Sequence, residues 1–222
     1  MSQDDLLARL AKLDTCAVSD ALDRLGLRGA TYGARPLWPC PRIVGRVVTV
    51  KLKPAGFEKP KQHLGTAPID AANPGDVIVI DSGGRLDVSA WGGLLSLGAK
   101  LKGLSGVVID GACRDIDESR ELGFPVYARG ALPMTARGRI VQESFNQEIA
   151  FAGVQVHPGD LVIADGSGVV FIPQAKEKEI IEEAEAVAHQ EARMADGIRQ
   201  GLSIVEVMEK LGYESMLRKG KE

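Results

Sequence analysis

The feature that most constrains the fold is the segment Gly-Val-Val-Ile-Asp at 106–110, in which an uninterrupted apolar run precedes Asp110. Because no polar residue alternates with the apolar ones, the run is typical of a β-strand covered on both faces. Two other segments, NPGDVIVID at 73–81 and HPGDLVIAD at 157–165, each place a Pro-Gly-Asp turn before an apolar strand. This echo is short, so we interpret it as one local solution used twice and not as a duplicated domain.

Helical periodicity marks both ends of the chain. Apolar residues recur at helical spacing through 3–25, with a break near Asp14-Thr15, where either residue could cap a second helix. A long charged helix is predicted from Ala175 to about Gln200, and a shorter one over Ser203–Leu211. Further helices are predicted over Trp91–Lys102 and Ile116–Leu122. Strands are predicted over Ile43–Leu52, Val77–Asp81, Gly106–Asp110, Val126–Ala128, Arg139–Val141, Leu161–Asp165 and Gly168–Ile172. The stretches 28–42 and 53–61 are predicted to be irregular.

These elements predict one α/β domain over residues 1–222, with helical ends at 1–26 and 175–212. The 27 Lys and Arg against 30 Asp and Glu give a net charge of −3, which makes nucleic acid a poor partner. Three scattered cysteines offer no disulfide framework, and no segment has the apolar length of a signal peptide core or a membrane span. We therefore expect a cytoplasmic protein with no membrane partner.

The residues with the clearest chemistry lie in Trp91-Gly92-Gly93-Leu94-Leu95 and in VVIDGACRD at 107–115. Glycines at a helix start leave the first backbone N–H groups open to a carboxylate or phosphate. Arg114 and Asp115 follow a buried strand, where binding sites of α/β sheets gather. Arg114 offers a fixed cation to an enolate oxygen, and Asp115 offers a hard oxygen ligand to Mg²⁺. Spacing alone leaves open that this pair is only a surface ion pair.

The run from Trp91 to Gly130 resembles the family that joins the 4-hydroxy-4-methyl-2-oxoglutarate aldolases to the regulator of ribonuclease activity A. Some of its members were formerly labelled demethylmenaquinone methyltransferases. The resemblance extends to TCAVSDALDRLG, PGDVIVID, HPGDLVIADGSGVVFIP and the charged C-terminal helix. It implies a compact α/β domain with a layered β/β/α, swivelling-domain-like core, assembled as a homotrimer or a homohexamer.

The resemblance also implies an activity, that of a class II pyruvate aldolase that decarboxylates oxaloacetate. Asp115 would bind Mg²⁺ or Mn²⁺, and Arg114 would contact the 2-oxo group and stabilise the enolate. Backbone amides around Gly92, Gly93, Leu94 and Leu95 would hold the carboxylate of a small 2-oxo acid. Glu191, from the C-terminal helix of a neighbouring subunit, would contact the metal through water.

Position 93 departs from the family pattern. The aldolases usually carry an acidic residue twenty-one positions before the Arg, where this chain has Gly93. The departure leaves metal and enolate chemistry in place but questions aldol cleavage, so decarboxylation could be the more robust activity. Asp87 could compensate, although we interpret it as a turn residue.

Three alternatives remain to be weighed. A non-catalytic binding protein of the ribonuclease-regulator type would not keep the Arg114–Asp115 pair, so an enzyme is favoured. The segment after VGRVVTVKL has no Gly-rich loop opening a helix, which argues against a methyltransferase with a nucleotide-type cofactor. His63, His157 and His189 lack zinc-ligand spacing. His63 lies in a loop where it could approach a ligand, but we interpret it as a surface residue.

Overall fold

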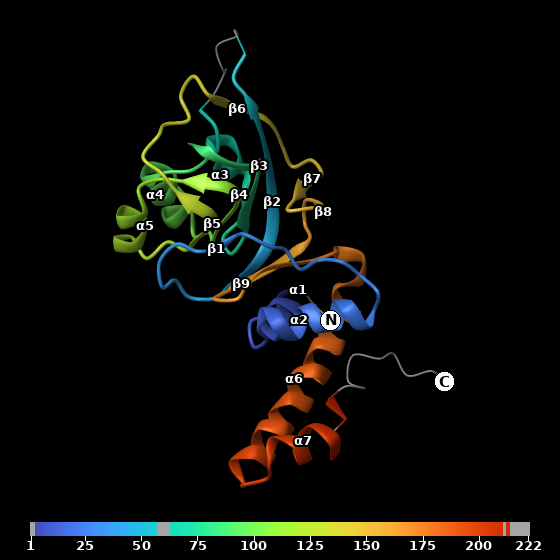
Figure 1. Cartoon of the computed structure of the whole chain (residues 1–222). Coiled ribbons are helices and arrows are strands. Elements are labelled where there is room, and N and C mark those ends of the chain that lie inside the picture. Colours follow the sequence, from blue (N-terminus) through green and yellow to red (C-terminus); the bar gives the residue numbers. More distant parts are fainter. Residues whose placement is uncertain (1–2, 57–62, 211, 214–222) are drawn as a thin grey trace.

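The computed structural model describes residues 3–56, 63–210 and 212–213. They form a single α/β domain built around a large mixed sheet, with helices at both ends (Figure 1). The strands of the sheet are β1 (Arg35–Pro36), β2 (Ile43–Pro54), β3 (Val77–Ser89), β4 (Gly106–Cys113), β5 (Val126–Ala131), β6 (Ile140–Phe145), β9 (Leu161–Asp165) and β10 (Gly168–Ile172). A separate hairpin pairs β7 (Ile149–Phe151) with β8 (Val154–Val156). The helices are α1 (Gln3–Leu10), α2 (Thr15–Arg24), α3 (Thr66–Ala71), α4 (Gly93–Lys102), α5 (Ile116–Glu121), α6 (Glu177–Arg199) and α7 (Ile204–Lys210), with a 3₁₀ turn at Gln174–Lys176.

The strand order of the sheet is β1-β5-β4-β3-β2-β9-β10, with β6 paired to β2. Strands β2 to β5 run parallel, whereas β9 pairs antiparallel with the first residues of β2 and β6 with its last. One long strand thus joins two parts of the sheet. An isolated bridge between Ala30 and Val170 connects the segment before β1 to β10, so the sheet nearly closes on itself.

Strand β4 is covered on both faces, which confirms the prediction from its uninterrupted apolar run. Val107 and Ile109 pack with Trp91 and Phe124 in a core beneath α4 and α5. Val108 points the other way and packs in a second core inside the curved sheet with Tyr127. Successive strand residues face opposite sides, so one strand serves two layers. This arrangement is the predicted layered core.

The terminal helices form the third layer. Side chains of β9 and β10, among them Ile163 and Ile172, pack against Leu10, Val18 and Ile180 of the helices α1, α2 and α6. Helix α6 then extends past the sheet, and α7 turns back along it (Figure 1). Among the described residues, no helix has both the length and the apolar character needed to cross a membrane.

The predicted break between the first two helices is confirmed, and Asp14 is the cap. Its carboxylate oxygen Oδ1 accepts a hydrogen bond from the Ala17 amide at 2.8 Å. Other boundaries differ from the prediction. Strand β3 continues to Ser89, beyond the predicted end at Asp81. The sequence does not show this extension, because the second half of the strand is largely polar and bends through register shifts. The elements α3, β1, β7 and β8 were not predicted. Of the predicted loop 53–61, residues 57–61 lie outside the described residues, as does Leu211 at the end of the last helix.

Candidate active site

The residues proposed from the sequence converge on one open cavity of about 420 Å³ at the first turn of α4. Gly92, Gly93, Leu94 and Leu95 form one wall, and Arg114 and Asp115 extend from the end of β4. The cavity is also lined by residues that were not predicted. These are Leu64, Thr66, Ser89, Glu118, Thr135, Ala136 and Arg137. Trp91, from the glycine motif singled out in the sequence, also lines the cavity, as does His63, which is exposed as predicted.

The first turn of α4 offers backbone donors to this cavity. The Gly93 amide donates a hydrogen bond to Asp115 Oδ2 at 2.9 Å. The amides of Leu94 and Leu95 have no acceptor among the described residues, as is usual at a helix start. With the positive end of the helix dipole behind them, they suit a carboxylate.

Asp115 lies in the left-handed region, with a φ of 59° and a ψ of 43°. This conformation turns the chain sharply between β4 and α5 and directs the carboxylate back toward α4. Its Oδ2 atom also lies 3.4 Å from Arg114 Nε. A Cβ on Gly92 would lie 2.7 Å from that same oxygen, so a side chain at this position would force the Asp115 carboxylate to move. Asp115 Oδ1 has no hydrogen-bond partner among the described residues.

A buried chain of polar contacts fixes this arrangement from behind. Trp91 Nε1 donates to Ser96 Oγ at 2.9 Å, and Ser96 Oγ lies 2.9 Å from Ser119 Oγ. The Ser119 hydroxyl in turn donates to the backbone carbonyl of Asp115 at 3.2 Å. All three side chains are buried, so the chain ties α4 to α5 at the point where Asp115 turns.

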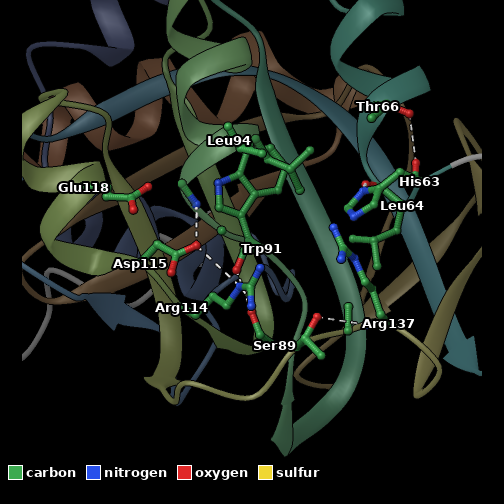
Figure 2. A pocket seen from close by; sticks show the side chains of 15 residues that line it. His63, Leu64, Thr66, Ser89, Trp91, Leu94, Arg114, Asp115, Glu118 and Arg137 are labelled. Atoms are coloured by element: carbon green, nitrogen blue, oxygen red, sulfur yellow. Dashed lines mark hydrogen bonds and ion pairs between the residues drawn. The ribbon is translucent and has the colours of Figure 1, made fainter.

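The opposite wall carries positive and neutral polar groups. Figure 2 shows Arg137, His63 and Thr66 across the cavity from Asp115 and Glu118. The Arg137 guanidinium has no ion-pair partner among the described residues. The cavity therefore presents one guanidinium from Arg114 on one side and a second from Arg137 on the other.

Two other candidates from the sequence lie outside this cavity. Asp87 is paired with Arg85 at 2.8 Å and does not line the cavity. It lies within strand β3, so its interpretation as a turn residue is wrong. Glu191 lies on α6, and within one chain it does not line the cavity either. Burial, together with the negative charges of Asp14 and Asp20, raises the pKa of the Glu191 carboxyl. Its role from a neighbouring subunit stays a prediction.

Cys113, the residue before Arg114, is not a suitable nucleophile. Burial, with a smaller contribution from the charge of Asp115, raises the pKa of its thiol to about 12. The thiolate that nucleophilic chemistry needs is therefore not populated at neutral pH.

The donor set fits a hard divalent cation held mainly by water and substrate. Asp115 presents a carboxylate oxygen to the cavity. No group of three or more His, Cys, Asp or Glu among the described residues could hold a metal ion. Mg²⁺ commonly binds through one or two carboxylates and keeps several waters, whereas a zinc site needs more protein ligands.

Comparison with known proteins identifies similar chains. Residues 15–171 match the RraA-like family, described as Aldolase/RraA. A protein of Halalkalibacterium halodurans, provisionally assigned as a 4-hydroxy-4-methyl-2-oxoglutarate aldolase, is 33% identical over 180 residues, which cover 81% of this chain and 82% of that protein. Protein DlpA of Legionella pneumophila is 30% identical over 210 residues, 95% of this chain, but the chain spans only 34% of DlpA.

A solved structure shares the fold. RraAS2 of Streptomyces coelicolor, described as an unusual member of the RNase ES inhibitor RraA protein family, superposes with a TM-score of 0.78 at 27% identity. The match covers 88% of this chain and 96% of that one. Both an aldolase name and an inhibitor name thus occur among the similar proteins.

Proposed function

Because the chain belongs to the RraA-like family, we propose that it is a divalent-metal-dependent lyase acting on 2-oxo acids through a pyruvate enolate. The reactions proposed are aldol cleavage of the 4-hydroxy-4-methyl-2-oxoglutarate type and decarboxylation of oxaloacetate. One observation carries the proposal: Arg114, Asp115 and the open amides of α4 meet in one cavity.

Each group has a separate task. The amides of Leu94 and Leu95 hold the carboxylate next to the 2-oxo group. The Arg114 guanidinium faces the 2-oxo oxygen and stabilises the negative charge that develops there as the carbon–carbon bond breaks. A Mg²⁺ or Mn²⁺ ion held by Asp115 would supply Lewis-acid polarisation of the same oxygen.

The charge distribution of the cavity favours a substrate with two carboxylates. Both proposed substrates carry one carboxylate beside the 2-oxo group and a second at the far end. Arg137 and His63 lie across the cavity from the α4 amides, where they suit that second carboxylate (Figure 2). A monocarboxylic 2-oxo acid would leave the Arg137 cation without a partner.

The test is release of pyruvate from oxaloacetate and from 4-hydroxy-4-methyl-2-oxoglutarate, with Mg²⁺ and with chelator. We expect Asp115→Ala to lose at least about 10²-fold of the metal-dependent rate with both substrates, because it removes the metal ligand. Asp117→Ala is the matched control. Asp117 is two residues away, is highly exposed and does not line the cavity.

Protein-free blanks are subtracted, because oxaloacetate decarboxylates spontaneously with metal. Release from neither substrate by a folded wild-type protein would contradict the proposal. That result would favour the second candidate function, a non-catalytic binding protein. This candidate rests on the similarity to RraAS2, which is described as a member of an RNase inhibitor family.

A further inference from the structure

Position 93 contains no side chain, yet the space beside it holds a carboxylate. A Cβ atom on Gly93 would overlap Glu118 Oε2 and lie 2.8 Å from Glu118 Cδ. Asp115 Cβ would lie 3.3 Å from the same point. The carboxylate of Glu118 thus occupies the volume in which a side chain at position 93 would begin. Gly93 and Glu118 are a steric pair, because a side chain at 93 would displace Glu118.

The local fold explains why Glu118 reaches this place. Asp115 precedes α5, and Glu118 is the third residue of that helix, about one turn on and on the same side. A Glu at this position commonly turns back to the amide of the capping residue. The described residues provide no such hydrogen bond here, nor any ion pair for this carboxylate. Instead it lies against Gly93, in the wall of the cavity (Figure 2).

We propose that Glu118 is a catalytic residue of aldol cleavage, the proton acceptor for the substrate hydroxyl. This rests on the proposed function. The C4 hydroxyl gives its proton to a Glu118 oxygen, and the C4–O electrons form the product ketone. The C3–C4 bond breaks, and its electron pair forms the enolate of pyruvate. Glu118 then returns the proton to C3, so that two pyruvates result and Glu118 is regenerated.

The two reactions of the site place different demands on Glu118. Decarboxylation of oxaloacetate forms the same enolate but has no hydroxyl proton to remove. Glu118→Gln keeps the size of the side chain and removes its basicity. We therefore expect it to lower cleavage of 4-hydroxy-4-methyl-2-oxoglutarate by about 10²-fold or more, and decarboxylation by less than about fivefold. Glu121→Gln, on the same helix and exposed, is the matched control and leaves both rates unchanged.

Moving the acid tests the steric pair directly. Glu118→Ala empties the space, and adding Gly93→Asp in the same chain places a carboxylate back into it. The double variant is expected to recover at least tenfold of the cleavage that Glu118→Ala loses. Gly93→Asp alone would crowd two carboxylates into one volume, so it is expected to lose activity.

Binding of Mn²⁺, measured by calorimetry, separates this role from that of a metal ligand. Glu118→Gln should bind Mn²⁺ within about threefold of wild type, whereas Asp115→Ala should not bind it measurably. Wild-type cleavage in Glu118→Gln, an equal loss of both reactions, or loss of Mn²⁺ binding would overturn the proposal. Retained decarboxylation in that variant would leave the proposed function standing.

Discussion

At the scale of the residue, the site depends on an uncommon backbone conformation. Only Asp115, Asn146 and Ala152 among the described non-glycine residues have a positive φ. Such conformations cost of the order of 1–3 kcal/mol and persist where surrounding contacts hold them. At Asp115 those contacts are the Gly93 amide on the side chain and the Ser119 hydroxyl on the backbone carbonyl. The strained residue is therefore the one to which we assign the metal.

Ser96 supports that conformation without touching the cavity. Ser96→Ala leaves the buried Trp91 N–H without its acceptor and removes one of the two partners of the Ser119 hydroxyl, which is expected to lower the free energy of unfolding by about 1–3 kcal/mol. Urea denaturation measures this loss. Ser105→Ala is the control, because its hydroxyl bonds to Gly75 at an exposed position. Equal effects of the two substitutions would show that the buried chain contributes nothing particular.

Arg114 and Asp115 could be predicted as site residues from the sequence, because both directly follow a clearly recognisable strand within a short motif. Glu118 and Arg137 left no comparable signal. Glu118 is one acid among several on a short helix, and only the missing Cβ of Gly93, twenty-five positions earlier, gives it a role. Arg137 belongs to a segment without periodicity, and the fold alone brings it opposite Arg114.

At the scale of the element, predictability follows length and regularity. Strand β4 and helix α6 were predicted well because an apolar run and a helical repeat each extend over enough residues. The second half of β3, after Asp81 and up to Ser89, was missed because it is largely polar and has Gly83 and Gly84 at positive φ. Such a bent strand has no period-two pattern to detect.

Where α2 and α6 meet, the negative charge of Glu191 destabilises the folded protein. Burial and the charges of Asp14 and Asp20 raise the pKa of its carboxyl, so the charged form is disfavoured in the folded protein. Glu191→Gln is expected to raise the melting temperature at pH 7 by about 1–3 °C, since a partly exposed charge is screened. As pH falls through the raised pKa, Glu191 is protonated in the folded protein before it is protonated in the unfolded one. The difference in melting temperature between wild type and Glu191→Gln therefore shrinks. Below the ordinary value of 4.5 the two proteins should melt together.

Calorimetry at pH 7 and pH 4 checks this sign. Glu182→Gln is the control, because Glu182 is exposed on the same helix and pairs only weakly with Lys178 at 3.9 Å. A wild type that melts above Glu191→Gln at pH 7 would contradict the expected penalty.

At the scale of the whole molecule, one chain leaves apolar surface beside the site. Leu94, Leu97 and Leu101 are 85%, 40% and 80% exposed and lie at helical spacing along α4. Contiguous apolar stripes are uncommon on monomers and usually mark an interface. The predicted homo-oligomer would cover this stripe and bring a second copy next to the cavity. The far half of α6 projects from the domain (Figure 1).

Mixed oligomers test whether Glu191 acts from that neighbour. Asp115→Ala and Glu191→Ala are each expected to be nearly inactive alone. If a site takes Asp115 from one chain and Glu191 from the next, chains unfolded and reassembled together form some intact sites. Random assembly of equal amounts would restore about a quarter of the wild-type activity, because one junction in four combines the two intact residues. Mixing without subunit exchange is the control. If Glu191 served its own chain, refolding the mixture would restore nothing, since no chain carries both residues. If Glu191 served no site, Glu191→Ala alone would be as active as wild type.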